Sequence, residues 1–204
     1  MTHLRFLGTT SDDGDCPTLY KVEGTTHPEM VPFSEIAPLF REFKHTAFRL
    51  ETRRGYASDR NGPKWERWKS GADIATEPDN AWRENVRAQT AEGKRFERVR
   101  LVDQPLTEGQ RFLLASGHSN VSAGEDIRNL PRAEAERIGL PDHDFWLFDS
   151  RLIARFVFDE NDTTLGVVLS EDSAEVAAAC QARDAAWHHA TRTADFARAA
   201  ASTG

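Results

Sequence analysis

The chain has 204 residues, of which 39% are hydrophobic and 29% are charged, and its formal net charge is −7. This length and composition suit one globular domain with a full core and exclude a globally disordered chain. The negative charge disfavours a phosphate backbone as a partner, and no apolar run approaches the roughly 18 residues that a membrane-spanning helix needs.

The two cysteines, Cys16 and Cys180, are far apart in the chain. They form no CxxC pair, so neither a disulfide framework nor a zinc ribbon is expected. The first ten residues lack the basic and apolar regions of a signal peptide. We therefore expect a reduced, cytoplasmic protein.

Residues 1–33 are predicted to form an N-terminal extension. Short strands are expected at 4–8 and 18–23, on either side of the polar turn "TTSDDGDCP", and together they predict a small β-hairpin. The following stretch contains a glycine and two prolines and is typical of a linker. The main domain is then expected to cover 34–204.

The first half of the main domain alternates helical and extended patterns. Apolar residues at helical spacing predict a helix from Ser34, as N-cap, to about Phe43. The segment "AFRLET" at 47–52 alternates apolar and charged residues, which is typical of a half-buried strand. Further helices are predicted to begin at Pro63 and at Asp79, which can act as an N-cap.

Two tryptophans, Trp65 and Trp68, are three residues apart in the helix that is predicted to begin at Pro63. At this spacing both rings share one helix face. An exposed pair would form a docking platform for a partner, whereas a buried pair would pack on the core, which is the more common use of aromatic stripes. Both interpretations stay open.

From residue 95 onward the order of elements is clearer. Extended patterns predict strands at 95–102, 125–130, 145–149, 151–159 and 165–169. One helix is predicted between Thr107 and Gly124, and a second at 132–139. The residues expected on the inward face of the first are Phe112, Leu114, Ala115, His118 and Val121.

The C-terminal segment, from Asp172 to about Ala200, is predicted to be one long helix. Asp172 and Glu175 resemble a capping box at its start. At about 1.5 Å per residue such a helix spans roughly 40 Å, which exceeds the width of a domain of this size. Its alanine-rich end is therefore expected to project or to dock on a partner.

These elements together predict an α+β fold. We expect a mixed β-sheet of five or six strands with helices packed against it, a long C-terminal helix and a small N-terminal β-hairpin. No internal repeat is visible in the sequence.

Arg98 and Arg100 are the best candidates for binding an anion. In a strand their side chains point to the same face, because side chains alternate with a period of two. The simpler interpretation is a solvated sheet face, and the alternative is a patch that binds an anion, a partner or a nucleic acid. Because the whole chain is acidic, direct binding of nucleic acid is not expected.

Neither a metal site nor a serine hydrolase site is expected from the motifs. The adjacent His188 and His189 point roughly 100° apart on a helix, so they cannot hold one ion together. Asp184 and His188 share a helix face, but such a pair is more often a surface contact than a ligand set. The stretch around Ser116 and His118 does not match the GxSxG motif of serine hydrolases, and its pattern predicts the interior of a helix. We expect no cofactor.

Four segments carry a resemblance to a known family: "AFRLETRRGY" (47–56), "RFERVRLVDQPLTEGQRF" (95–112), "NVSAGEDIRNLPR" (120–132) and "LPDHDFWLFDSRLIARFVFD" (140–159). The chain resembles the domain of unknown function 6879, an uncharacterised family of actinobacterial proteins. The resemblance covers about 34–195 and implies no known activity. Because members tend to occur beside helix-turn-helix regulators, it implies a regulatory or partner-binding role.

A second resemblance concerns the strand order and the segment at 140–159. It is similar to one half of a phospholipase D-type domain, whose signature is H-x-K-x-x-x-x-D. Aligned on Asp149, Asp142 takes the position of the nucleophilic histidine and Asp144 that of the phosphate-binding lysine. Both changes reverse the required chemistry, and His143 is one residue out of phase. The resemblance therefore implies a scaffold that has lost its catalysis.

The acids ahead of the apolar run at 145–148 have two interpretations. They form the polar start of a core strand, or Asp142, His143 and Asp144 join Glu125 and Asp126 in a metal-binding or acid–base cluster. We favour the first interpretation.

The sequence therefore favours a non-enzymatic regulatory or protein-interaction module. Its expected partner is a protein, such as a helix-turn-helix regulator, and no membrane association is expected. The alternative is a phosphodiesterase-like or metal-dependent hydrolase that uses the acidic lip at 142–149.

Overall fold

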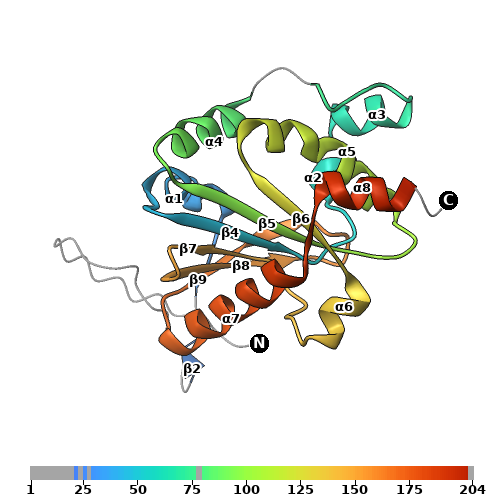
Figure 1. The fold of residues 1–204 in the computed structure, drawn as a ribbon. Helices are drawn as coiled ribbons and strands as arrows, with labels where there is room; N and C mark the ends of the chain where they lie inside the picture. Colours follow the sequence, from blue (N-terminus) through green and yellow to red (C-terminus); the bar gives the residue numbers. More distant parts are fainter. Residues whose placement is uncertain (1–20, 23–24, 27–28, 77–79, 202–204) are drawn as a thin grey trace, which may run out of the picture.

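A computed structural model describes the backbone of residues 21–22, 25–26, 29–76 and 80–201, and side chains within 29–76 and 80–198. Its centre is a mixed sheet of eight strands in the order β10-β6-β5-β4-β7-β8-β9-β3. Helices lie on both sides of this sheet (Figure 1). The expected α+β fold is confirmed. The expected count of five or six strands is too low, because two-residue strands extend both edges of the sheet.

The strands are β3 (Met30–Val31), β4 (Thr46–Glu51), β5 (Arg95–Val102), β6 (Asp126–Pro131), β7 (Phe145–Phe148), β8 (Leu152–Phe158), β9 (Thr164–Ser170) and β10 (Thr191–Arg192). β4, β5 and β6 are parallel, and the remaining pairs of the sheet are antiparallel. The chain therefore builds outward from β4 to β6 and then returns to the other side of β4 as β7.

The helices of the main domain are η1 (Phe33–Ile36, a 3-10 helix), α1 (Leu39–Glu42), α2 (Ala57–Arg60), α3 (Pro63–Lys69), α4 (Ala81–Ala91), α5 (Glu108–Ala123), α6 (Arg132–Arg137), α7 (Ser173–His189) and α8 (Thr193–Ala201). Figure 1 shows α1, α4 and α5 on one face of the sheet and α6 and α7 on the other. No helix in the described part of the chain is long and apolar enough to cross a membrane.

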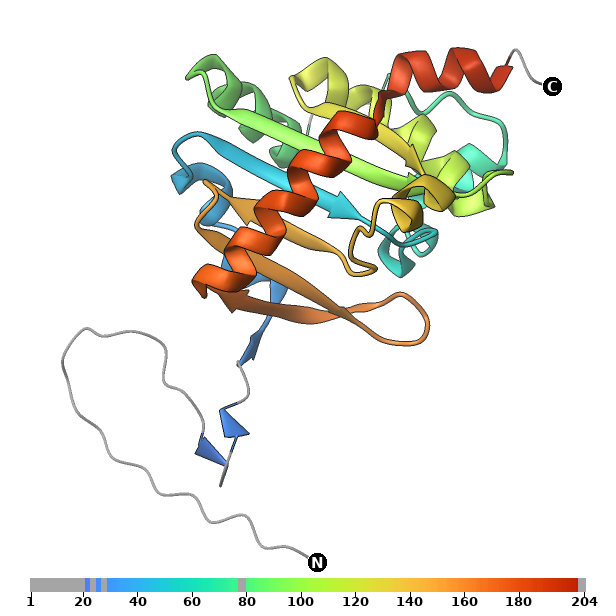
Figure 2. The ribbon, with the colours of Figure 1, turned by 60° about the horizontal axis from the view of Figure 1, so that its bottom comes forward.

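Each face of the sheet has its own apolar core. The core beneath α1 and α4 includes Phe40, Phe43, Val86, Phe96, Trp146 and Phe148. The core beneath α6 and α7 includes Phe48, Leu50, Val99, Leu130, Leu147 and the small residues Ala179, Ala182 and Ala186. Alanines on α7 let this helix lie close to the sheet, which it crosses diagonally in Figure 2.

The N-terminal part differs from the expected hairpin and linker. The strands expected at 4–8 and 18–23 lie outside the described residues, apart from β1 (Lys21–Val22), which pairs antiparallel with β2 (Thr25–Thr26). Within the expected linker, β3 pairs antiparallel with β9 and closes one edge of the sheet.

The helix expected from Ser34 to Phe43 is instead two short helices, η1 and α1. Pro38 stands between them, and a proline has no amide hydrogen with which to continue the helical hydrogen bonds. No side chain caps η1, so Ser34 is not the expected N-cap. Asp79 lies outside the described residues, and the side chain of Asn80 caps α4 by accepting from the amide of Arg83.

The prediction of a single long C-terminal helix is wrong. α7 ends at His189, Ala190 is extended, and β10 pairs with β6 before α8 begins. The hydroxyl of Thr193 donates to the carbonyl of Ile127 at 2.8 Å and accepts from the side-chain amide of Asn129 at 3.0 Å. The chain is therefore anchored to β6 between α7 and α8, and the two helices run in different directions (Figure 2).

Candidate functional site

The acidic lip at 142–149 does not converge on one point. Asp142 is fully exposed, and the ring of His143 lies on the face of the sheet that carries Phe145. Asp144 is one residue further along, so its side chain points to the opposite face and is buried. Burial and the nearby Arg155 lower the pKa of His143. Within the described residues, no three histidine, cysteine, aspartate or glutamate side chains are placed to hold a metal ion.

Asp144 forms buried hydrogen bonds that hold two separate parts of the chain together. Its carboxylate accepts hydrogen bonds from Arg49 Nη2 at 2.7 Å, from the amide and the hydroxyl of Thr52 at 2.7 Å each, and from the hydroxyl of Tyr56 at 2.6 Å. Burial, together with the nearby carboxylates, raises the pKa of Tyr56. The four bonds join the end of β4 and the following loop to the start of β7, and they occupy the acid fully.

Asp149 also forms hydrogen bonds that hold the strand in place, at the other end of β7. Its carboxylate accepts from the backbone amides of Lys44, His45 and Thr46 at 2.7, 2.7 and 3.0 Å. Burial alone would raise the pKa of Asp149, but the three amide donors outweigh it and lower the pKa. The two acids at the ends of β7 therefore fix the strand in the sheet at separate places.

The two tryptophans of α3 lie against α5. Trp65 is buried with its ring centre 5.0 Å from that of Phe112, and Trp68 is half-buried at 5.6 Å from the same ring. Their own ring centres are 5.2 Å apart. Together with Ile74 they form a small core of their own, so the packing interpretation describes their position.

Arg98 and Arg100 share one face of β5, as the strand pattern predicts, but this face is covered by α5 and is not solvated. Arg98 Nε donates to Glu125 at 2.6 Å, and its Nη1 donates to Glu51. Arg100 Nε donates to the second oxygen of Glu51 at 2.6 Å, and its Nη1 donates to the carbonyl of Leu113 at 2.6 Å. The interpretation as a solvated sheet face is wrong.

Helix α5 lies close to β5 because small residues face the sheet. A Cβ atom added at Gly117 would stand 2.9 Å from Arg100 Nη1. Ser119 and Ala123 continue the same buried side, whereas His118 and Val121, expected on the inward face, are exposed. The close approach is what buries the two arginines.

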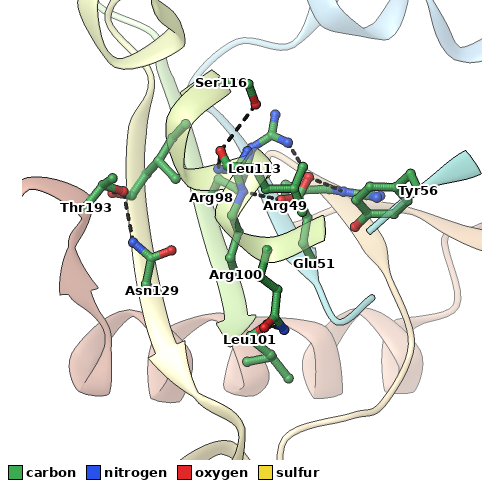
Figure 3. A network of polar contacts seen from close by, with 12 residues as sticks. Arg49, Glu51, Tyr56, Arg98, Arg100, Leu101, Leu113, Ser116, Asn129 and Thr193 are labelled. Carbon is green, nitrogen blue, oxygen red and sulfur yellow. Dashed lines mark hydrogen bonds and ion pairs between the residues drawn. The ribbon is translucent and has the colours of Figure 1, made fainter. Parts of the chain in front are cut away.

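A row of buried charges therefore crosses four strands on this face. Its members are Glu125 before β6, Arg98 and Arg100 on β5, Arg49 and Glu51 on β4, and Asp144 before β7. Figure 3 shows the arginines of β4 and β5 gathered around Glu51, with Leu113 and Ser116 of α5 beside them. Three positive and three negative side chains balance one another.

The electrostatics of the row centre on Glu51. Burial alone would raise its pKa, but Arg98, Arg100 and Arg49 outweigh this effect and lower the pKa to about 2. Burial alone would lower the pKa of Arg98, but Glu125 and Glu51 raise it above its ordinary value. Glu51 and Arg98 are therefore both ionised near neutral pH.

Four members of this row, Arg49, Glu51, Arg98 and Arg100, form the floor of a pocket of about 570 Å³. Six aromatic side chains also line it: Phe33, Phe40, Tyr56, Trp82, Trp146 and Phe156. Ser116 and Asn120 of α5 and Thr164 of β9 contribute polar groups. We call this cavity the arginine–aromatic pocket. It lies between α5 and the face of the sheet that β4, β5, β7 and β8 present to this helix.

Some of the hydrogen-bond donors on the arginines of the pocket floor are unused. Arg49 Nη1 is buried and has no hydrogen-bond partner. The Nη2 atoms of Arg98 and Arg100 also make no hydrogen bond within the described residues. A buried guanidinium with unused N–H groups costs free energy unless a ligand or water accepts from them.

One acid of the pocket stands apart from the row. Asp59, on α2, lines the pocket, and its carboxyl group has no hydrogen-bond or ion-pair partner among the described residues. Burial, and then the charge of Glu51, raise the pKa of Asp59 to about 6. This group therefore changes its charge just below neutral pH.

Sequence reasoning found Arg98 and Arg100 but missed the rest of the pocket. The missed polar residues are Arg49, Glu51, Tyr56 and Asp59. One signal was present: "AFRLET" has charged residues at the alternate positions 49 and 51, "RFERVRLV" has them at 98 and 100, and the two segments are neighbouring strands. Charges on two adjacent strands at matching positions predict a paired, inward-facing cluster when both faces of the sheet are covered.

Comparison with known proteins gives one family match. Residues 34–198 match the family described as a domain of unknown function, DUF6879. No curated protein matches the chain. A structure of Nuc from Salmonella typhimurium, a phospholipase D family member, is similar over 78% of this chain and 88% of that chain, at 10% sequence identity and a TM-score of 0.46. A likeness at this level carries no information about activity.

Proposed function

The chain belongs to the DUF6879 family of unknown function, and we propose that it is a non-enzymatic regulatory module that binds a small ligand in the arginine–aromatic pocket and signals this to a protein partner. The observation that carries the proposal is a pocket of ligand size in which Arg49, Arg98 and Arg100 lie beside six aromatic side chains. The arginines supply charged hydrogen-bond donors, and the rings supply apolar contact surface.

The charged floor is better suited to binding than to a reaction. Glu51 is held ionised between Arg98 and Arg100, and Asp144 is saturated by four donors. A general base needs a pKa near the working pH and access to the proton that it removes. Arginines that are already oriented by carboxylates are instead a rigid set of donors.

Helix α5 supplies a route from the pocket to the surface. Ser116 and Asn120 line the pocket, whereas His118 and Val121 on the same helix are exposed. Because a ligand would contact the inner side of α5, its binding would shift the helix and with it the exposed side. A protein partner would bind this exposed side. The family resemblance implies a helix-turn-helix regulator as the kind of partner.

A pocket-filling variant tests the proposal. We expect the full-length wild-type protein, isolated from cells under gentle conditions, to release a bound small molecule on denaturation, as measured by mass spectrometry. Ser116→Trp places an indole in the pocket and should abolish this release. Ser122→Trp is the matched control, because Ser122 is exposed on the other side of the same helix. Equal release from both variants would contradict the proposal.

The partner is tested with the same pair of variants. Affinity capture with the tagged full-length chain should recover a partner whose amount changes at least about fivefold between wild type and Ser116→Trp, since a coupling of about 1 kcal/mol produces a change of this size. Ser122 is close to Val121, so Ser122→Trp is not used here, and Ser70→Trp, on an exposed position of another helix end, serves as control. Repeated capture without a partner would count against a regulatory role.

The alternative, a hydrolase that uses the lip, is tested by a phosphodiester assay. Bis(p-nitrophenyl) phosphate with Mg²⁺, Mn²⁺ or Zn²⁺ should not be hydrolysed. Loss of activity in Asp144→Ala or Asp149→Ala would report lost structure, because both acids hold β7. Activity that disappears in Asp142→Asn and His143→Gln, with thermal unfolding unchanged, would overturn the proposal in favour of an enzyme.

A further inference from the structure

We propose that the arginine–aromatic pocket takes a planar aromatic monoanion whose carboxylate lies on Arg98 and Arg100 and whose ring lies between the aromatic side chains. This inference rests on the proposed ligand pocket and adds the chemical class of the ligand. It follows from the charge of the floor, from the unused donors and from the character of the walls.

The balance of charge disfavours a cation and a dianion relative to a monoanion. Arg49, Arg98 and Arg100 are matched by Glu51, Glu125 and Asp144, so the floor is neutral before a ligand binds. A cation would approach guanidinium groups that already hold their counter-ions. On this neutral row a monoanion leaves an excess of one negative charge and a dianion an excess of two, so the dianion is disfavoured more strongly.

The donors fit a carboxylate. Arg98 and Arg100 use their Nε and Nη1 atoms on protein acceptors, and neither Nη2 atom makes a hydrogen bond in the part of the chain that the structure describes. Two guanidinium groups on the same face of one strand can each donate to a carboxylate, and hydrogen bonds of this charged type are stronger than neutral ones. The Glu51 carboxylate that orients both arginines keeps these donors fixed before the ligand arrives.

The walls fit a flat ring. Phe40 meets Trp82 edge-on with ring centres 5.3 Å apart, and it meets Trp146 edge-on at 4.9 Å. The guanidinium of Arg49 lies over the ring of Phe156, 3.7 Å from its centre. Rings in such arrangements present both faces and edges, so a planar ligand gains stacking and edge contacts beyond simple burial.

Asp59 makes the binding of an anion depend on pH. Its carboxyl group faces Glu51, which opposes its ionisation, and Arg100, Arg98 and Lys64, which favour it. The neutral acid leaves the pocket uncharged, whereas the ionised acid adds one negative charge beside a ligand of the same sign. The affinity for a monoanion is therefore higher when Asp59 is protonated.

The experiment is calorimetric titration of the full-length chain with four probes. They are 2-naphthoate, the uncharged 2-naphthalenemethanol, the non-planar cyclohexanecarboxylate and the dianionic 2-naphthyl phosphate. We expect 2-naphthoate to bind at least about tenfold more tightly than each of the others, the difference that one additional charge-assisted hydrogen bond of about 1.4 kcal/mol produces.

Variants locate the binding. Ser116→Trp should abolish the binding of 2-naphthoate. Asp59→Asn keeps the shape of the side chain and removes its charge, so at about pH 8 it should bind 2-naphthoate about tenfold more tightly than wild type, and at about pH 5.5 equally well. Asp142→Asn removes an exposed acid that does not line the pocket and should change nothing.

The outcomes separate the two proposals. Tighter binding of the alcohol, of cyclohexanecarboxylate or of the phosphate, abolished by Ser116→Trp, would overturn the ligand class and leave the pocket as a ligand site. Binding of 2-naphthoate that Ser116→Trp and Asp59→Asn do not affect would overturn both. Absence of binding by all four probes would overturn this inference, and the release of a small molecule in the mass-spectrometric test would then decide on the proposed function alone.

Discussion

Phe48 and Leu50 of β4 point to the face of the sheet that α7 covers, whereas Arg49 and Glu51 of the same strand point to the face that α5 covers. Phe48 and Leu50 are 0% exposed, and Arg49 and Glu51 are each 4% exposed. One strand therefore has two equally buried sides, of which one is apolar and the other consists of ion pairs.

The difference shows which face supplies stability. Burying apolar surface contributes about 25 cal/mol per Å², and the alanines of α7 let the apolar face pack closely. Burying an ion pair removes two charges from water, and their attraction seldom returns more than this cost. The charged side of β4 is thus a weaker source of stability than its apolar side, and the rigid donor set that it presents to the pocket is a better reason for its presence.

Removing the charge of Glu51, at the centre of the row, should have the largest effect on the free energy of unfolding. Glu51→Gln leaves Arg98 and Arg100 with a neutral partner and should lower the free energy of unfolding by about 3–5 kcal/mol. Urea-induced unfolding measures this loss. Leu50→Ala, on the other face of the same strand, should cost about 2–5 kcal/mol by leaving a cavity. A loss below about 1 kcal/mol for Glu51→Gln would mean that water replaces the carboxylate easily.

The pH dependence of stability distinguishes the two faces even where the losses are similar. The pKa of Glu51 is lowered from 4.5 to about 2 in the folded protein. Its contribution is therefore present above pH 4.5 and is lost as the pH falls toward 2, and it amounts to about 3 kcal/mol. Leu50→Ala should keep this dependence in urea unfolding between about pH 5 and pH 2.5. Glu51→Gln should lose it, and an unchanged dependence in this variant would contradict the assignment.

Asp59 should have a smaller effect on the free energy of unfolding than Glu51, and of the opposite sign. Its pKa is raised from 3.8 to about 6, so ionisation is less favourable in the folded than in the unfolded protein. Stability is therefore lost as the pH rises from 3.8 to about 6, and Asp59→Asn should be more stable than wild type at neutral pH by about 1 kcal/mol, after allowance for partial exposure. Thermal unfolding should show this gain near neutral pH and none at about pH 3.

The sequence predicts the strands and their faces well because these depend on local patterns. The alternation in "RFERVRLV" places Arg98 and Arg100 together, and the glycines at 124 and 139, both with positive φ, end the helices that precede them. The break after His189 has no such signal. Alanines lie on both sides of it, and only Thr191 and Thr193, which have low helix propensity, interrupt the pattern where Thr191 and Arg192 pair with β6.

The pocket could be predicted only in part, for a physical reason. An alternating apolar and charged strand is ordinarily read as half-exposed, and whether its charged side is covered depends on another element. Here α5 covers it because Gly117 allows a close approach, a property that a search for apolar spacing overlooks. The pocket lining comes from segments between Phe33 and Thr164, and only the fold brings them together.

The smallest effect is expected at the acidic lip, where two neighbouring acids differ as strongly as the two faces of β4. Asp142 is fully exposed, so Asp142→Ala should change the free energy of unfolding by less than about 0.5 kcal/mol. Asp144→Ala removes the acceptor of four hydrogen bonds and leaves Arg49 without its carboxylate, so it should cost about 3–5 kcal/mol. Urea unfolding of both variants measures the contrast. A large loss in Asp142→Ala would show that the lip, and not only its buried member, holds the strand, because a solvated side chain has no internal partner to lose.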